Sequence, residues 1–498
     1  MNRLLAATLA SFLLCGAPPA TADSPDGTTP LHEAVYRGDA AEVGRLLEAG
    51  ADPATANLFG ATPMMLAAAR GDAPVLRLLL DAGADADSPN DEGQTALMVV
   101  ARTAAVEAAR LLVKRGADVN AREAWGGQTA LMWAAAQCQP EMVRLLVKAG
   151  ARVEERSTVR DWQRRVTAEG RPKDMYRGGL TPLLFAAREG CIPGVEALLD
   201  AGADIDRDDP DGATALVMAL LNRHWDTARF LIEAGADVNL WDIYGQTPLY
   251  VAVDMNTLPI GRRPEIPSMD RATGLDIVRL LLARGANPNA QLKLRPRYRN
   301  IPNDRYRDPM LVWGTTPLLR AAKAGDLPVM KLLLAHGALA DLANSQGVTP
   351  LMAAVGDGHI HDPTRGLPRT EVEALECYTL LRAAGANVNA RTLLGYADAD
   401  LKIRTPANRT ALHAAASRGW DSVVRKLVED GAELDVLDSN GLSPIDYAMG
   451  RFPKEFNALL PEQHTGTVAL LRSLGAKAEN PAATFPAGTT PKIQAVVP

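Results

Sequence analysis

The chain has 498 residues; 47% are apolar, only 5% are aromatic, and the formal net charge is -6. This apolar content excludes a disordered chain, and beyond residue 22 no run approaches the ~18 consecutive apolar residues expected of a membrane-spanning helix. The small negative charge argues against a dedicated nucleic-acid binder.

The first 22 residues have the pattern of a secretory signal. Arg3 precedes an apolar run ending at Leu14, and residues 20–22 (Ala-Thr-Ala) fit the small-x-small cleavage pattern. We therefore expect cleavage after residue 22, a periplasmic or secreted protein, and a short lead over residues 23–28. Cys15 leaves open a lipid anchor, although Leu14 stands where bacterial lipoprotein signals have a small residue. Membrane contact is expected only if Cys15 is lipidated.

A repeat of 33 residues dominates the rest of the chain. A Thr-Pro-Leu-like tripeptide recurs eleven times, with consecutive spacings of 33, 33, 34, 52, 33, 33, 69, 33, 61 and 33 residues. It begins at Thr29, Thr62, Thr95, Thr129, Thr181, Thr214, Thr247, Thr316, Thr349, Thr410 and Ser443. An Ala-rich stretch, a Leu-Leu stretch and a Gly-Ala pair follow each copy.

Each unit is predicted to form two short antiparallel helices and a turn. In the first unit, Thr29 can cap the first helix and Pro30 suits its first position, because its missing N–H would have no partner there. Gly50 supplies the left-handed residue that ends the second helix. A single unit buries too little apolar surface to stand alone, so neighbouring units must stack.

The repeat resembles the ankyrin repeat, in "TPLHEAVYRGD" at Thr29, "TALHAAASRGW" at Thr410, and "GADVN" at Gly116 and Gly235. The resemblance covers residues 29–478 and is closest to long exported bacterial ankyrin-repeat proteins. It implies an all-α ankyrin-repeat α-solenoid of about eleven helix-turn-helix units. It also implies a non-catalytic scaffold that binds a protein partner through hairpin tips and the first helices of a concave face. We expect a monomer without cofactor, ending in a disordered tail at 479–498.

Three long spacings locate insertions in the inter-repeat loops, or fingers. The finger insertions fall within 151–180, 291–315 and 391–409, and further insertions separate the two helices of the seventh, ninth and last units. Fingers and inter-helix turns are expected on opposite edges of the solenoid. Loops of this length inside a compact fold are commonly functional or disordered.

The finger insertions differ in chemistry from the rest of the chain. They hold 18 Lys or Arg against 9 Asp or Glu, a net +9, while the remaining mature chain carries -16. Arginine, tryptophan and tyrosine are enriched in interface hot spots, so we expect a partner-binding surface here. Its candidate residues are Arg160, Trp162, Arg164, Arg165, Tyr176, Arg297, Tyr298, Arg299, Arg305, Tyr306, Arg307, Trp313 and Tyr396. The alternative is that these loops are simply solvated or pinned to the acidic solenoid.

Other constellations give weaker signals. His359 and His361 with Asp362 have the right ligand types for a metal site, but a His-x-His alone is weak evidence. His32 and His413 occupy the His position of the ankyrin pattern, and His224 occupies a second repeat position, so all three are expected to be structural.

The mature chain keeps three cysteines, Cys138, Cys191 and Cys377, and no Cys-x-x-Cys motif. An odd and sparse set does not predict a disulfide framework. A bridge between Cys138 and Cys191 is compatible with the repeat register but is not favoured, because packed helices lie about 8 to 10 Å apart.

The sequence thus predicts an exported protein-binding scaffold. One alternative is a binder of anionic lipid or polysaccharide through the basic fingers. The other is a metal- or redox-linked accessory protein.

Overall fold

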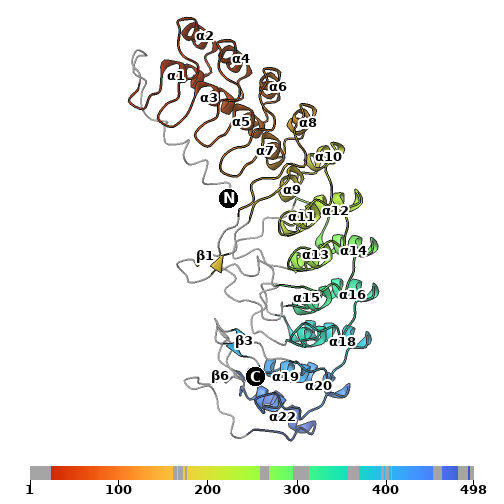
Figure 1. Ribbon diagram of the computed structural model, residues 1–498. Coiled ribbons are helices and arrows are strands. Elements are labelled where there is room, and N and C mark those ends of the chain that lie inside the picture. Colours follow the sequence, from red (N-terminus) through yellow and green to blue (C-terminus); the bar gives the residue numbers. More distant parts are fainter. Residues whose placement is uncertain are drawn as a thin grey trace. The chain divides into compact units, whose positions relative to one another are not determined.

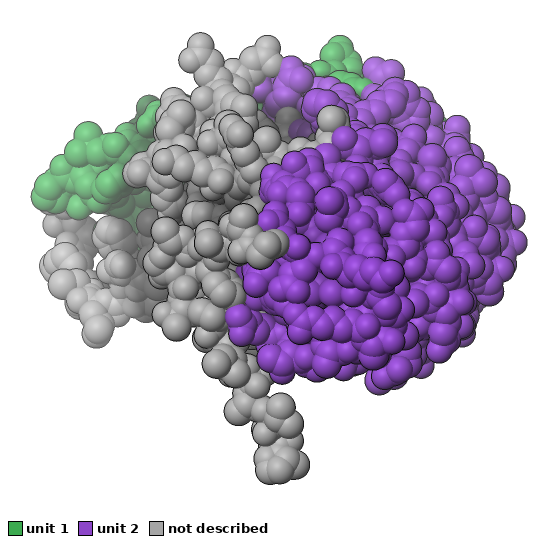
Figure 2. All heavy atoms as spheres, turned by 90° about the horizontal axis from the view of Figure 1, so that it is seen from below, with its two compact units in different colours: residues 1–158, 193–203 green, residues 159–192, 204–498 purple. Residues whose placement is uncertain are grey.

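The computed structural model describes residues 24–160, 165–166, 172–173, 177–257, 269–294, 313–356, 369–393, 397–398, 403–404, 406–451, 462–480 and 492–493. The chain divides into two compact units, coloured separately in Figure 2. Unit 1 comprises residues 1–158 and 193–203, and unit 2 comprises residues 159–192 and 204–498.

The described residues hold 22 helices, in line with eleven predicted helix pairs. The helices of unit 1 are α1 Pro30–Arg37, α2 Ala40–Glu48, α3 Pro63–Arg70, α4 Ala73–Asp81, α5 Ala96–Thr103, α6 Val106–Lys114, α7 Ala130–Ala136 and α8 Pro140–Lys148, and α10 Ile192–Asp200 belongs to this unit except for its first residue. Each of α1, α3, α5 and α7 packs on its own second helix, and these four first helices pack on one another in chain order, so two rows form (Figure 1).

The helices of unit 2 are α9 Pro182–Arg188, α11 Ala215–Leu221, α12 Trp225–Glu233, α13 Pro248–Thr257, α14 Gly274–Ala283, α15 Pro317–Ala324, α16 Leu327–Ala335, α17 Pro350–Ala354, α18 Glu371–Ala383, α19 Ala411–Arg418, α20 Asp421–Glu429, α21 Pro444–Ala448 and α22 Thr465–Ser473. They repeat this arrangement from α11 onwards, and α9 packs on α11. The all-α repeat solenoid expected from the sequence is confirmed.

The repeat tripeptide starts the first helices as predicted. The Thr62 hydroxyl accepts a hydrogen bond from Met65 N at 3.2 Å, and Pro63 takes the first position of α3. Gly71 ends α3 with φ 67, in the left-handed region that favours glycine. Ala67 and Ala68 are fully buried, which lets neighbouring first helices approach closely.

His32 and His413 add further hydrogen bonds to the caps of their helices. Thr410 N donates to His413 Nδ1 at 3.1 Å, and His413 Nε2 lies 3.2 Å from the carbonyl oxygen of Leu442 in the next repeat. His32 bonds in the same way to Thr29 and to the carbonyl of Ala61. The arrangement requires a neutral ring with its proton on Nε2, and burial lowers the pKa of His413 to about 4.

Backbone hydrogen bonds join the fingers within each unit. In unit 1, Leu58 N donates to Asp26 O at 2.8 Å and Ala124 N to Glu92 O at 2.9 Å. In unit 2 the same bond links Ile243 N to Asp211 O, Ser345 N to Trp313 O and Ser439 N to Ala407 O, at 2.8 to 3.0 Å. These bonds hold successive finger tips in register.

The ladder is intact at the second and third finger insertions because the residues at the two ends of each insertion, its root, pair with each other. Leu292 N donates to Thr315 O and Gly314 N to Leu292 O, at 3.0 and 2.8 Å. Thr392 pairs with Asn408 and Arg409 in the same manner.

Short antiparallel strands extend two of the roots. In the first insertion β1 Arg165–Val166 pairs with β2 Pro172–Lys173, and in the third β3 Ala397–Asp398 pairs with β4 Ile403–Arg404. Near the C-terminus β5 Glu462–Gln463 pairs in parallel with β6 Lys492–Ile493. The predicted disordered tail falls largely outside the described residues.

The His413 cap predicts a pH-dependent stability. Because the pKa of His413 in the folded protein lies below the ordinary histidine value of 6.5, this contribution to stability is present above pH 6.5 and is lost as the pH falls towards 4. Between pH 7 and pH 4 the wild type should lose about 3 kcal/mol more free energy of unfolding than His413→Gln. Urea unfolding followed by circular dichroism measures this difference; equal losses in the two proteins would contradict it.

Candidate functional site

The structure describes few of the side chains predicted to bind a partner. Arg160 lies at the first root, where its backbone N donates to Arg177 O at 2.7 Å. Trp313 lies at the second root and is 59% exposed. Arg165 is placed only as a backbone residue of β1. The other ten lie outside the described residues, namely Trp162, Arg164, Tyr176, Arg297, Tyr298, Arg299, Arg305, Tyr306, Arg307 and Tyr396.

The exposed face of the first helices differs between the units. In unit 1 the positions four and seven residues after each repeat Thr are largely accessible, with Tyr36 59% exposed and Arg102 and Ala69 also exposed. In unit 2 none of the corresponding residues is exposed, and Asp254 and Arg320, which form an ion pair there, have no accessible surface. This face of the first helices is therefore inaccessible at these positions in unit 2.

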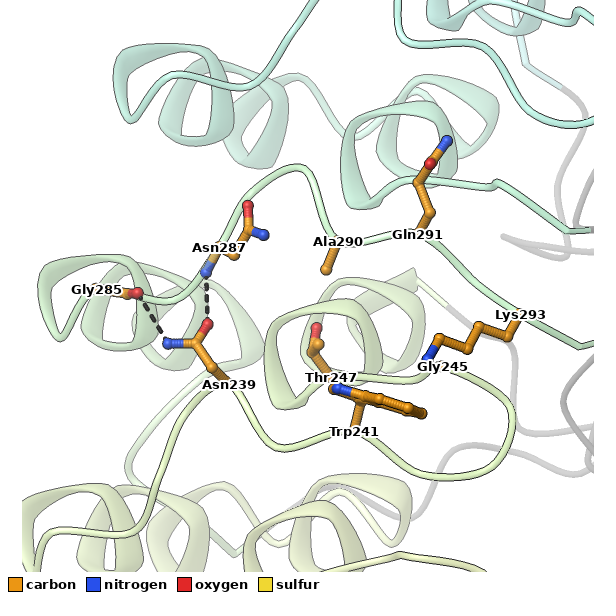
Figure 3. A pocket seen from close by; sticks show the side chains of 9 residues that line it. All are labelled: Asn239, Trp241, Gly245, Thr247, Gly285, Asn287, Ala290, Gln291 and Lys293. Atoms are coloured by element: carbon orange, nitrogen blue, oxygen red, sulfur yellow. Dashed lines mark hydrogen bonds between the residues drawn. The ribbon is translucent and has the colours of Figure 1, made fainter.

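A cleft of about 390 Å³ lies between two fingers of unit 2, at the root of the second insertion (Figure 3). Trp241 is 53% exposed, and Lys293 Nζ lies 2.9 Å from the centroid of its indole ring. Lys293 is held in place because its backbone N donates to Tyr244 O at 2.8 Å. The indole ring of Trp241 and the ammonium group of Lys293 are thus in contact at the protein surface.

A ladder of asparagines builds the wall of this cleft. Asn239 Nδ2 donates to Gly285 O at 3.1 Å, and Asn239 Oδ1 accepts from Asn287 N at 2.9 Å, as the dashed lines of Figure 3 show. Asn120, Asn289 and Asn389 make the same pair of bonds between other repeats. The amide of Asn239 is therefore structural, and the cleft offers a ligand mainly Trp241 and Lys293.

The carboxylates of Asp209, Asp211 and Asp242 lie close to one another in the adjacent fingers. Asp242 Oδ1 accepts from Tyr244 N and Gln246 N, both at 2.9 Å, and the residue is 4% exposed. Burial, together with the charges of Asp209 and Asp211, raises the pKa of Asp242 to about 7. Burial also raises the pKa of Asp209.

One basic residue of the first finger is attached to this acidic cluster. Arg177 Nη1 lies 3.8 Å from Asp211 Oδ1. Arg177 therefore behaves as the alternative interpretation predicts, in which basic finger residues pair with the acidic solenoid. Lys293 differs, because its ammonium group lies over the exposed indole of Trp241.

The expected structural histidines are confirmed. His224 Nε2 lies 3.0 Å from Arg188 O, and His464, for which the sequence suggested no role, makes the equivalent contact to Ser417 O at 3.1 Å. The metal-site candidates His359, His361 and Asp362 lie outside the described residues. Within the described ranges, no group of three His, Cys, Asp or Glu side chains could hold a metal ion.

The expectation that disfavoured a disulfide was wrong. Cys138 and Cys191 are both disulfide-bonded, whereas Cys377 is a buried free thiol. Both bonded cysteines lie in turns between helices, and Cys138 has φ 54, so the spacing of packed helices does not limit their reach. Burial raises the pKa of Cys377 to about 11, which makes it a poor nucleophile.

Sequence reasoning missed Trp241 and Lys293. The local signal was a tryptophan immediately before the Asp of a finger turn, in "NLWDIYGQTP", with a lysine in the next finger. Trp241 was missed because it belongs to a finger of ordinary length, and Lys293, although inside the segment 291–315, was missed because only arginine and aromatic residues were selected there.

Comparison with known proteins agrees with this architecture. A family model described as ankyrin repeats in three copies matches residues 5–90, 64–157, 183–292, 269–362 and 376–467. The chain belongs to the ankyrin-repeat family. Ankyrin repeats characterise protein-interaction scaffolds, and the described residues contain no helix with the length and apolar character needed to cross a membrane.

Several curated relatives share stretches of repeats. Over 193 residues the chain is 30% identical to the putative ankyrin repeat protein YahD of Escherichia coli K12, a match covering 34% of this chain and 87% of that protein. It is 32% identical to the B-cell lymphoma 3 protein homolog of Mus musculus, over 38% of this chain and 35% of the relative. It is 34% identical to the nuclear factor NF-kappa-B p105 subunit of Gallus gallus, over 49% and 19%. The chain thus spans about a third or less of these two longer relatives.

The raised pKa of Asp242 predicts that Asp242→Asn stabilises unit 2 at alkaline pH. Asn57, Asn90 and Asn344 fill the same finger position with the same two backbone bonds, so an amide fits there. Because the pKa of Asp242 in the folded protein lies above the ordinary aspartate value, its contribution to stability is lost as the pH rises through about 7. The gain in melting temperature of the variant over wild type should therefore be larger at pH 8 than at pH 5; an equal gain at both would contradict the assignment.

Proposed function

We propose that this protein is an exported, non-catalytic scaffold that binds another protein through the finger edge of unit 2. The observation that carries the proposal is the exposed root surface, defined as Trp241, Lys293, Leu294, Trp313 and Leu393. These side chains surround the points where the second and third insertions leave the solenoid.

The chemistry of this surface suits a protein partner. Trp241, Trp313 and Leu393 are 53%, 59% and 73% exposed, and such apolar groups form the centres of interfaces when a partner covers them. Lys293 places a positive charge beside the indole of Trp241 and is one of the basic residues that give the finger insertions their net +9. A partner with an acidic, partly apolar surface fits this combination.

Export is supported by two features. The first 22 residues have the composition of a secretory signal, and Cys138 and Cys191 are disulfide-bonded. Structural disulfides persist in oxidising compartments such as the periplasm and are rare in the cytosol.

Capture from periplasmic extract tests the finger hypothesis. A trimmed variant lacks residues 161–176, 295–312 and 394–405, while the hydrogen-bonded roots remain to hold the repeats in register. We expect the intact protein to retain partner proteins that the trimmed variant loses.

The matched control removes residues 258–268 and 357–368, which lie between helices instead of in fingers. This control should keep the captured proteins, and circular dichroism checks that each variant is folded. Recovery of the same proteins by the intact and the finger-trimmed chains would refute the proposal. Binding to anionic liposomes or polysaccharide that disappears with added salt, without protein capture, would instead favour the alternative function.

Thiol counting tests the oxidised state. The mature chain isolated from the periplasm should show one titratable thiol after denaturation without reductant, from Cys377, and three after reduction. In the native protein Cys377 should react slowly at pH 8, because it is 1% exposed and its pKa is raised to about 11. Three thiols without reductant would contradict the disulfide and weaken the case for export.

A further inference from the structure

The cleft at the root of the second insertion has room for a small ligand. Its volume of about 390 Å³ falls within the ~300–1,000 Å³ that is typical of ligand pockets. In Figure 3 the indole of Trp241 lies across the cleft from Ala290, and Lys293 lies at one end. Trp241, Asn287 and Lys293 are all exposed, so the cleft is open to water. A ligand bound here would keep part of its surface solvated.

Lys293 is a cation without a carboxylate partner. Its ammonium group lies over an indole ring, and within the described part of the chain no Asp or Glu oxygen lies within ion-pair distance of it. Arg177 at the first root and Arg391 next to the third root differ, because each lies close to a carboxylate, at 3.8 and 2.6 Å. None of the described residues that line the cleft is acidic. Lys293 therefore gives the cleft a positive charge.

Asn287 adds a hydrogen-bond donor to the same cleft. Its Oδ1 accepts from Asn289 N at 2.9 Å, and its backbone N donates to Asn239 Oδ1, so the amide is held in one orientation. Its Nδ2 makes no hydrogen bond to the described residues, which leaves both of its N–H groups for a ligand. The cleft thus combines a flat aromatic ring, a cation and an amide donor.

We propose that this cleft binds an acidic saccharide built of uronic acids. The C–H face of a sugar ring can lie on the indole of Trp241, while its carboxylate accepts hydrogen bonds from the Lys293 ammonium group and a hydroxyl accepts one from Asn287 Nδ2. A contact between a cation and an exposed ring is weak, so the carboxylate can draw Lys293 away and uncover the ring. The remaining hydroxyls of a saccharide stay in water, which suits an open cleft better than a wholly apolar ligand does.

This inference goes beyond the proposed function and does not depend on it. A saccharide fills the cleft alone, whereas a protein bound to the root surface would also cover Trp313 and Leu393, which do not line the cleft. Saccharide binding and protein capture can therefore be measured separately, and either can fail without the other.

Calorimetric titration tests the site. The probe is trigalacturonate, a trimer of galacturonic acid, and isothermal titration calorimetry measures its affinity for the full chain. Lys293→Met and Trp241→Ala should each weaken binding about tenfold, because the first removes the ammonium group and the second removes the ring. The neutral galactose trimer, which keeps the rings and lacks the carboxylates, should bind at least about tenfold more weakly than trigalacturonate.

The matched controls are Lys331→Met, which removes an exposed charge from α16, and Trp313→Ala, which removes an exposed ring outside the cleft. Both should bind trigalacturonate within about twofold of wild type, since a distant charge is screened. An equal loss in Lys331→Met would show general attraction to basic residues and overturn the proposal. No binding of trigalacturonate, or undiminished binding by Lys293→Met or Trp241→Ala, would overturn it too. So would equally tight binding of benzoate, because a carboxylate on any flat ring would then suffice.

Discussion

The structure depends on one kind of backbone contact that recurs between most successive fingers of each unit, in which the tip of one finger donates an N–H to a carbonyl of the preceding finger. Each repeat is too small to fold alone, so it must present the same helix faces and the same finger tip to its neighbours. Insertions are tolerated only where they leave these contacts unchanged. The pairing of residues 292 and 315, and of 392 and 409, meets this requirement.

Much of the fold was predictable because the repeat constrains it at regular positions. Thr, Pro and Gly set the start and end of the first helices for local reasons, and the eleven copies fixed the number of units. The roles of His32, His224 and His413 followed from their positions in the repeat. His464 could not be assigned in this way, because the insertion before it hides its register.

The candidate site was less accessible to sequence reasoning. Composition identified the fingers as basic and aromatic, but it could not show that Lys293 lies over Trp241, since that contact joins different fingers. Nor could it show that the equivalent first-helix positions are buried in unit 2 but largely exposed in unit 1, because that difference depends on tertiary packing. The disulfide-bonded state of Cys138 and Cys191 was missed because helix spacing was applied to residues that lie in turns.

The paired roots have a consequence for how such a protein can change. Because both ends of an insertion are already joined by hydrogen bonds, lengthening the loop between them costs only the slowly growing entropy of closing a longer loop, about 0.6 kcal/mol per doubling. The loops between the roots at 292–315 and 392–409 can therefore change in length and sequence at little cost to the repeats on either side. The solenoid could display new recognition sequences in these loops, because the residues that form the helix contacts and the root hydrogen bonds would not change.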